Sequence, residues 1–350
     1  MSMIIGVPKE LKNREYRVGL TPKAVETMVK NGHKVSVEGE AGTGAGFSDD
    51  DFKKAGAEIT NSRFIWVGSN MIVKVKEPLA EEMERYSRLM IEWPCEKPPE
   101  GNLIIFAFPH FPANPHLKKI IKEKQINVMP YENIQLDDGT RPALRAMSKI
   151  AAEISVDSAA HYLRKENGGK GKLLKDATAV VIGCEGALGK TAFEILAQRG
   201  SRVIGFERPE KLRPPTPLRR KFVVSTEKLE YFLKFADIVI GAAALKNEGA
   251  PKLITRKMLK LMQPGSVIVD PSIDEGGCCE TSRPTSHDNP VYIEEGIIHY
   301  CVANMPGAVP RSSTPALVKE TMLYILEVAN KGWEKALAEN PVLAQAAKID

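Results

Sequence analysis

The stretch from Thr178 to Glu207 constrains the fold more than any other, because it reads as strand, glycine turn, helix and second strand. Ala179 to Ile182 is a short, β-branched apolar run, as expected of a strand buried on both faces of a parallel sheet. Apolar residues then recur at helical spacing, and Gly200 stands where a helix would end in a left-handed residue. The stretch therefore predicts one unit of a doubly wound α/β sheet.

Three glycines at the turn of this unit, Gly183, Gly186 and Gly189, predict a phosphate site. A pyrophosphate there would be held by backbone N–H groups and the positive end of the helix, and a β-carbon would obstruct it. Glu207, at the end of the second strand, is placed to accept hydrogen bonds from two ribose hydroxyls. Glycines alone also fit an ordinary tight turn, but strand, helix and terminal acid together favour dinucleotide binding.

Composition places the chain among ordinary globular proteins. Its 350 residues, 43% hydrophobic and 27% charged, suffice for two domains with cores of their own. The net charge of +5 has a local source, because residues 202–222 hold seven basic and two acidic side chains. That stretch fits a solvated loop or a contact with a cofactor phosphate. No aromatic residues alternate with these charges, which argues against nucleic-acid binding.

The five cysteines predict neither a disulfide framework nor a zinc site, because none stands in a C-x-x-C pair and Cys278 and Cys279 are adjacent. No metal site is therefore expected. A reducing cytoplasm fits this usage best. No segment approaches ~18 uninterrupted apolar residues, so membrane insertion is not expected.

Strand and helix patterns alternate along the first 130 residues. Strands are expected at 3–7, 34–38, 71–75, 103–108 and 126–129, and helices at 22–30, 50–57, 79–86 and 115–124. Thr21 is expected to cap the first helix, with Pro22 in its first turn. The alternation predicts a parallel sheet with helices on both faces.

The second half continues the alternation after a long amphipathic helix expected at 147–164. Further strands are expected at 222–224, 237–241, 266–270 and 297–302, and a last long helix at 315–331. We expect two Rossmann-like doubly wound domains with a cleft between them. Residues 1–146 and 310–350 would form a discontinuous substrate domain, and 147–309 a dinucleotide-binding domain.

Several polar side chains stand at predicted strand ends, which face the ligand crevice in open α/β sheets. Arg17 follows the first strand, Lys76 ends the VKVKEP strand, and His110 follows IIFAFP. In the second domain, Asp274 and Asn304 lie after two later strands. A 2-oxo or amino acid needs a guanidinium for its carboxylate, a cation near its carbonyl and a proton donor. Each residue alone also fits a solvated or structural role.

Longer segments resemble one family. They are GVPKELKNREYRVGLTP, GFSDDDFKKAGAEI, VKVKEP, NGGKG, ADIVIG, APKLIT and the run from PGSVIVDPSIDEGG to HYCVANMPGAVPRSSTPAL, spread over nearly the whole chain. In them the chain resembles the alanine dehydrogenase family, which is similar to the nucleotide-binding domain of pyridine nucleotide transhydrogenase. The resemblance implies NAD-dependent oxidative deamination of L-alanine to pyruvate and ammonia, and the reverse reductive amination.

The resemblance also implies roles for the polar residues. Arg17 would bind the substrate carboxylate, Lys76 would polarise the carbonyl, and His110 would be the acid/base. Asp274 would assist proton transfer and orient the amine, while Asn304 would line the pocket. The interval from the histidine to the Tyr131–Glu132 pair supports its assignment.

For the cofactor, the resemblance implies contacts of Ser148 with phosphate and of Val302 and Met305 near the nicotinamide. We expect NAD over NADP, because Glu207 should repel a 2′-phosphate, although Arg208 beside it could bind one. Members of the family are often hexamers, so the resemblance suggests a homo-oligomer. The expected substrate is a small amino acid or 2-oxo acid.

Some positions depart from the family pattern. Cys184 stands in the place of the first glycine of G-x-G-x-x-G, Glu185 enters the turn, and 88–101 is an insertion before the strand of His110. The two turn residues predict a displaced pyrophosphate or a weak cofactor affinity. The insertion motivates a first alternative, an oxidoreductase acting on another small amino or imino acid. A second is a non-catalytic NAD(H)-binding module like a transhydrogenase component.

Overall fold

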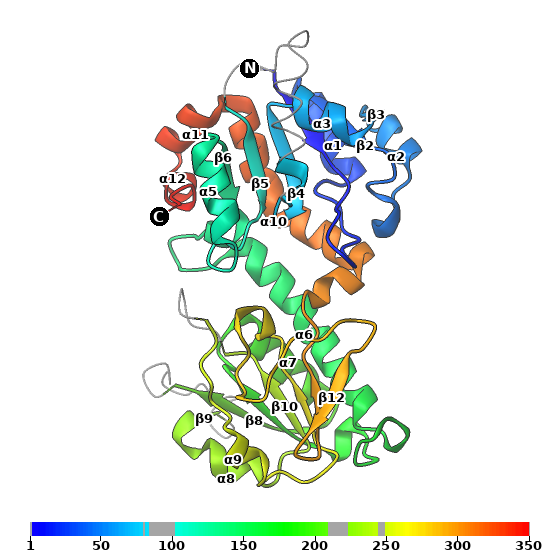
Figure 1. The fold of residues 1–350 in the computed structure, drawn as a ribbon, viewed down its shortest axis with the longest axis vertical. Helices are drawn as coiled ribbons and strands as arrows, with labels where there is room; N and C mark the ends of the chain where they lie inside the picture. The colour runs from blue at the N-terminus through cyan, green and yellow to red at the C-terminus, as the bar shows by residue number, and fades with distance from the viewer. Residues whose placement is uncertain (1, 80, 84–101, 209–222, 244–248, 350) are drawn as a thin grey trace. The chain divides into compact units, whose positions relative to one another are not determined.

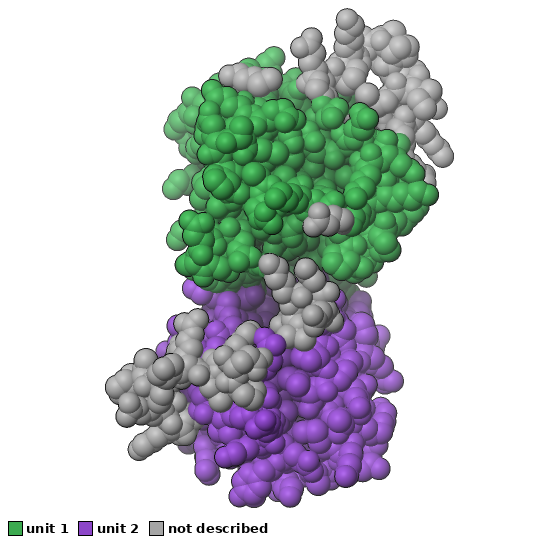
Figure 2. All heavy atoms as spheres, turned by 90° about the vertical axis from the view of Figure 1, so that its left-hand side faces the viewer, with its two compact units in different colours: residues 1–147, 307–350 green, residues 148–306 purple. Residues whose placement is uncertain are grey.

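The computed structural model describes residues 2–79, 81–83, 102–208, 223–243 and 249–349 (Figure 1). The chain forms two compact units, coloured separately in Figure 2. Unit 1 comprises Met1–Met147 and Gly307–Asp350, and unit 2 comprises Ser148–Pro306. The boundary between them falls within one helix, α6 (Pro142–Tyr162). Within the described residues, no helix combines the length and the apolar character needed to cross a membrane.

Unit 1 is built on a parallel sheet of strand order β3-β2-β1-β4-β5-β6. The strands are β1 (Ile4–Val7), β2 (Lys34–Glu38), β3 (Glu58–Thr60), β4 (Met71–Lys76), β5 (Ile104–Phe108) and β6 (Asn127–Pro130). The chain moves outward from β1 in one direction and then, from β4 onward, in the other. The carboxyl ends of β1 and β4 therefore form the switch point of this sheet, where ligands bind in doubly wound folds.

Helices surround this sheet. They are α1 (Pro22–Lys30), α2 (Asp49–Lys54), α3 (Ser62–Gly68), α5 (Pro115–Glu123), α10 (Pro310–Lys331), α11 (Trp333–Glu339) and α12 (Pro341–Ala346). Local sequence explains their starts: the Thr21 side chain accepts a hydrogen bond from the Ala24 N–H, and Ser48 forms a capping box with Asp51. One core cluster packs α3 and α5 against β5 through buried residues such as Trp66, Ile105 and Ile121.

Unit 2 holds a sheet of order β12-β13-β11-β10-β7-β8-β9, parallel except for β12 against β13. The strands are β7 (Thr178–Ile182), β8 (Arg202–Glu207), β9 (Val223–Ser225), β10 (Ile238–Gly241), β11 (Val267–Val269), β12 (Val291–Glu294) and β13 (Ile297–Tyr300). Besides α6, the helices are α7 (Ala187–Gln198), α8 (Leu229–Leu233) and α9 (Arg256–Leu259). Alternate residues of β7 face opposite cores: Val181 packs with α6 and α7, and Val180 with α8 and α9. The switch point of this sheet lies between β7 and β10.

The predicted fold class, two Rossmann-like α/β sheets, is confirmed, and most predicted elements lie within two residues of their observed bounds. Two helices begin earlier than predicted: α6 starts at Pro142 and not at 147, and α10 at Pro310 and not at 315. In each case a proline at the first helical position was passed over, although its missing N–H costs nothing there. The short β3 and α3 and the antiparallel edge strand β12 were missed.

Parts of other predictions lie outside the described residues. They are most of the helix expected at 79–86, the insertion at 88–101 and most of the basic stretch at 202–222.

Candidate active site

In unit 1, the three predicted polar residues follow three neighbouring strands. Arg17 lies in the loop after β1, Lys76 is the last residue of β4, and His110 comes two residues after β5. β4 and β5 are paired so that Lys76 lies opposite Phe108, with an irregular register just before this pair. Since β1, β4 and β5 are adjacent and parallel, all three residues stand at the same carboxyl edge, at the switch point.

Arg17 is held rigidly by Glu15. Its Nε and Nη2 donate to the two oxygens of the Glu15 carboxylate, at 2.7 and 2.5 Å, and its backbone N–H donates to Glu15 Oε1. Nη1 lies 3.1 Å from the sulfur of Met147. Both charged side chains are buried, so the pair satisfies a desolvated guanidinium in bidentate geometry.

His110 has an unusual backbone. Its φ of 46° lies in the left-handed region, which few residues other than glycine adopt. Its N–H donates to Glu132 Oε1 at 2.8 Å, and its carbonyl accepts from the N–H groups of Ala113 and Asn114. Its ring stacks on Phe108, with centroids 5.9 Å apart. The histidine is thus fixed from both sides, as strained residues at functional sites usually are.

Glu132, in the turn after β6, accepts the His110 N–H and stands in the field of Lys76. Burial raises the pKa of Glu132 to about 7, although the His110 N–H and the nearby charge of Lys76 lower it. The charge of Glu77 raises the pKa of Glu132. The Glu77 carboxylate itself pairs with Lys12 at 2.7 Å. Lys76 itself is buried. The carboxyl edge therefore gathers an imidazole, an ammonium and a carboxylate.

A second buried ion cluster supports the end of β4. The Lys74 ammonium lies 2.8 Å from Glu82 and 3.5 Å from Glu10, and all three side chains are almost fully buried. Glu10 also accepts from the Val75 N–H, and Glu82 from the Leu79 N–H. Burial raises the pKa of Glu10 to about 7, against the charge of Lys74, which lowers it. These bonds fix the backbone on either side of Lys76.

In unit 2, a pocket of about 300 Å³ opens at the switch point between β7 and β10. Four predicted cofactor residues line it: Ser148, Gly183, Gly186 and Glu207. The other lining residues are Ile182, Ala187, Leu188, Arg208, Thr226, Ala242, Ala243, Pro251, Leu253, Pro271, Ser272 and Glu275. The pocket therefore sits where a doubly wound sheet binds a dinucleotide.

The three glycines of the turn have different roles. Gly183 has a φ of 74°, and a β-carbon there would lie 2.5 Å from the Ala242 carbonyl oxygen. A β-carbon at Gly189 would lie 2.2 Å from the Gly183 carbonyl oxygen, so this glycine lets α7 approach the strand. At Gly186 a β-carbon would be 3.4 Å from that oxygen, an ordinary contact. Protein packing therefore does not demand glycine at 186, whereas a phosphate at this cradle would.

Gly186 is also the N-cap of α7, and no side chain caps this helix. The first N–H groups of the helix are thus available to an anion. The residues present fit the pyrophosphate of a dinucleotide.

Cys184 does not obstruct this cradle. Its side chain is buried, and its sulfur occupies the space beside Gly205, where an added β-carbon would be 2.7 Å away. It is not among the residues that line the pocket. The Glu185 N–H donates to Glu207 Oε2 at 3.3 Å, and the Arg208 N–H to Oε1 at 3.0 Å. The structure thus gives no support to a pyrophosphate displaced by the cysteine side chain.

The remaining predicted residues fall into two groups, one of hydrogen-bonded polar residues and one of buried apolar residues. The Asn304 N–H donates to Asp274 Oδ2 at 3.3 Å, so these two lie together, and Asn304 has a left-handed φ of 56°. Val302 and Met305, predicted near the nicotinamide, are both buried in the core of unit 2 and do not line the pocket. Among the described residues, no group of three or more His, Cys, Asp or Glu side chains is arranged to hold a metal ion.

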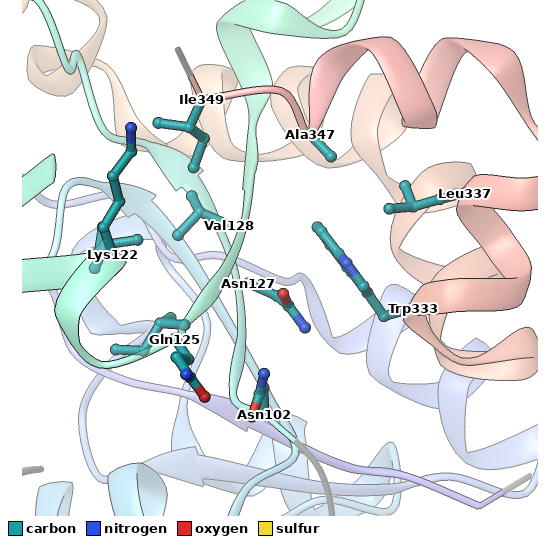
Figure 3. Close-up of a pocket in the computed structure, with 11 residues that line it drawn as sticks. Asn102, Lys122, Gln125, Asn127, Val128, Trp333, Leu337, Ala347 and Ile349 are labelled. Atoms are coloured by element: carbon teal, nitrogen blue, oxygen red, sulfur yellow. The ribbon is translucent and has the colours of Figure 1, made fainter.

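A larger cavity of about 450 Å³ lies elsewhere in unit 1, between α5, α11 and the start of β6 (Figure 3). Asn102 and Asn127 in its wall precede or begin β5 and β6, so it stands at the amino ends of these strands. His110 and Lys76 are at the opposite end of the same sheet. Trp333 and Leu337 give the cavity an apolar side. It is separate from the candidate site.

Comparison with known proteins decides the family. The N-terminal domain of the alanine dehydrogenase/PNT family matches residues 6–151, and its C-terminal domain matches residues 155–350. The chain belongs to this family. An alanine dehydrogenase of Halomonas elongata is 41% identical over 99% of this chain and 93% of its own length. One of Methanococcus maripaludis is also 41% identical, over 97% of this chain and 91% of its own length.

Solved structures agree with this membership. A structure of L-alanine dehydrogenase superposes with a TM-score of 0.88 at 35% identity, covering 99% of this chain and 95% of its own. A transhydrogenase from Sinorhizobium meliloti has a TM-score of 0.77 at 22% identity, covering 93% and 94%, and shares the fold. Membership of the family and the Rossmann-like fold imply NAD(H) binding, with the pocket at the β7 turn as its candidate site.

Sequence reasoning missed several residues that build the site. Glu15 stands two residues before Arg17, and this spacing was a usable signal. The sequence did not indicate that Glu10 and Glu82 are buried together with Lys74, and only the tertiary structure reveals this cluster.

Proposed function

We propose that this protein is an NAD-dependent alanine dehydrogenase, which converts L-alanine to pyruvate and ammonia and catalyses the reverse amination. The observation that carries the proposal is the gathering of Arg17, Lys76 and His110 at one carboxyl edge, with Arg17 held by Glu15 and His110 by Glu132. The named relatives and the dinucleotide-type turn of unit 2 support it.

In unit 1, Arg17 binds the substrate carboxylate with a guanidinium already oriented by Glu15. Lys76 donates to the substrate oxygen and polarises the carbonyl toward attack by ammonia. His110 gives and takes protons as the carbinolamine forms and collapses, which an imidazole can do near neutral pH. When bound, the nicotinamide supplies or accepts the hydride.

In unit 2, Asp274 assists proton transfer and orients the amine, and Asn304, bonded to it, presents its side-chain amide to the substrate. Ser148 contacts a cofactor phosphate from the wall of the pocket. Val302 and Met305 shape the nicotinamide site from within the core.

The cofactor we propose is NAD. Glu207 lines the pocket at the end of β8, and its carboxylate would accept ribose hydroxyls and repel a 2′-phosphate. Binding titrations with NADH and NADPH test this preference, and tighter binding of NADPH would contradict it.

The activity is tested by steady-state rates with NADH, ammonium and a panel of pyruvate, glyoxylate and larger 2-oxo acids. Turnover of another oxo acid but not pyruvate would favour the alternative substrate. H110A should abolish turnover and leave NADH binding intact. An inactive wild type that binds NADH would favour a transhydrogenase-like binding module.

We also propose that the protein assembles as a homo-oligomer, for which a hexamer is the form suggested by the family. Its substrate is a small amino acid or 2-oxo acid, and it acts in the cytoplasm. Light scattering after size-exclusion chromatography measures the assembly, and a monomer would contradict it.

A further inference from the structure

The Glu132 carboxylate accepts the backbone N–H of His110, the candidate acid/base, and stands in the field of Lys76, the candidate carbonyl-polarising lysine. It belongs to η2 (Tyr131–Asn133), directly after β6, and so reaches the site from the strand next to that of His110.

The hydrogen bond from the His110 N–H has a conformational consequence. A left-handed backbone at a non-glycine residue is strained and persists only where its surroundings hold it. Glu132 Oε1 accepts a hydrogen bond from the His110 N–H at 2.8 Å. The N–H groups of Ala113 and Asn114 donate to the His110 carbonyl. Without the carboxylate, the N–H would lose its partner and the histidine could relax to a right-handed conformation, which would re-aim its ring.

The second carboxylate oxygen of Glu132 does not take part in the hydrogen bond with His110. Within the described residues, Oε2 is buried and has no hydrogen-bond partner. A buried carboxylate oxygen of this kind requires a compensating charge or donor nearby. The charged groups that act on Glu132 are Lys76 and Glu77 from the end of β4, and Glu77 is itself paired with Lys12. The charge of Lys76 lowers the pKa of Glu132, so the lysine stands in the field of this carboxylate.

We propose that Glu132 is a positioning residue, which fixes the left-handed backbone of His110 by accepting its N–H. The inference rests on the proposed function, because it takes His110 as a reacting group. It assigns Glu132 no contact with substrate.

Two variants test the proposal. E132Q keeps an oxygen that can accept the His110 N–H, whereas E132A removes the acceptor. E123Q, on the exposed end of α5, is the matched control and should behave as wild type. E132A should lose about 10-fold or more in kcat with pyruvate while NADH affinity stays nearly unchanged, because a small misplacement of a catalytic group is costly.

E132Q should recover most of that loss, because its amide oxygen still accepts the N–H. Wild-type kcat in E132A would overturn the positioning role, and so would equal losses in both variants that track a loss of thermal stability.

A readout independent of turnover distinguishes this proposal from the proposed function. The imidazole signals of His110 can be followed by NMR and are identified by their absence from H110Q. They should shift in E132A and stay close to their wild-type positions in E132Q, because only E132A removes the acceptor that holds the His110 backbone. Unshifted signals in E132A would overturn the positioning role. This comparison holds even if the wild type does not turn over pyruvate, a result that would refute only the proposed activity. If E132A does not fold, E132Q is compared with the wild type, and displaced His110 signals in E132Q would overturn the positioning role.

Discussion

The guanidinium of Arg17 and the carboxylate of Glu15 form a bidentate ion pair in which both side chains are buried. The two residues are separated by only one position, so the loop after β1 carries both the cation and the group that orients it. A carboxylate ligand would meet a guanidinium whose plane is already set, which lowers the entropy lost on binding. The pair also means that Arg17 brings no uncompensated charge to the free protein.

Replacing Glu15 with Gln should show that the Glu15 carboxylate compensates the buried charge of Arg17. E15Q leaves a buried guanidinium without its counter-charge, which costs roughly 3–5 kcal/mol of stability for a broken buried pair. Pyruvate with NADH should then raise the melting temperature of E15Q more than that of the wild type, because the substrate carboxylate replaces the missing charge. Thermal unfolding with and without ligands measures both effects. The control E26Q breaks an exposed ion pair with Lys30. It should neither lose this stability nor gain a larger ligand-induced rise in melting temperature. Equal ligand shifts in E15Q and wild type would show that pyruvate does not bind at Arg17.

The buried cluster around Lys74 gives a prediction about stability. K74M leaves Glu10 and Glu82 buried with no cation between them and should destabilise unit 1 by roughly 3–5 kcal/mol. E10Q should cost much less, because a one-to-one pair of Lys74 and Glu82 remains and the glutamine can still accept the Val75 N–H. Urea unfolding at pH 8 compares the two. Similar losses would mean that Glu10, not the balance of charge, holds the cluster.

The same cluster predicts a pH dependence. The pKa of Glu10 is raised by burial from 4.5 to about 7, so the folded protein binds its proton more tightly than the unfolded chain does. This group therefore stabilises the fold least at high pH: stability should fall as pH rises from about 4.5 to about 7 and then level off. E10Q should make the profile flatter in that window. Melting temperatures at pH 5 and pH 8 measure the slope, and an unchanged slope in E10Q would assign it to other groups, such as Glu132.

Much of the fold was predictable because its signals are local. The apolar run at Ala179 to Ile182 and the glycines after it define a strand and a turn wherever they occur, and Thr21 before Pro22 defines a helix start. The partners of the site residues were harder to predict. Glu132 lies 22 residues from His110 and reaches it only because β5 and β6 are adjacent.

Burial was equally hidden in the sequence. Lys74 and Lys76 alternate in VKVKEP, a pattern typical of a strand with one solvated face, yet every residue of β4 is buried. The charges that surround β4 come from Glu10 and Glu82, on either side of it in the sequence. Local periodicity cannot report such compensation, because it depends on which strands become neighbours.

The glycines of the β7 turn should separate binding from stability. G186A places a methyl group at an ordinary contact distance from the protein, so its melting temperature should stay close to wild type while NADH binds about 10-fold or more weakly. G189A forces a methyl group against the Gly183 carbonyl oxygen and should destabilise unit 2 by about 1–3 kcal/mol. Calorimetry and NADH titration give both quantities. Undiminished NADH binding in G186A would place the pyrophosphate elsewhere.

Cys184 gives the last prediction, because its sulfur and the missing side chain of Gly205 share one space. C184G restores the usual glycine but empties part of the core, and should cost about 1–2 kcal/mol while changing NADH affinity less than about twofold. G205A alone should also destabilise, since its methyl group would lie 2.7 Å from the sulfur. In the double variant C184G/G205A the new methyl group takes the vacated space, so the combined loss should be smaller than the sum. A double-mutant cycle of unfolding free energies measures this coupling. Additive losses, or a marked gain in NADH affinity in C184G, would mean that the cysteine acts on the cofactor site and not on the packing beneath it.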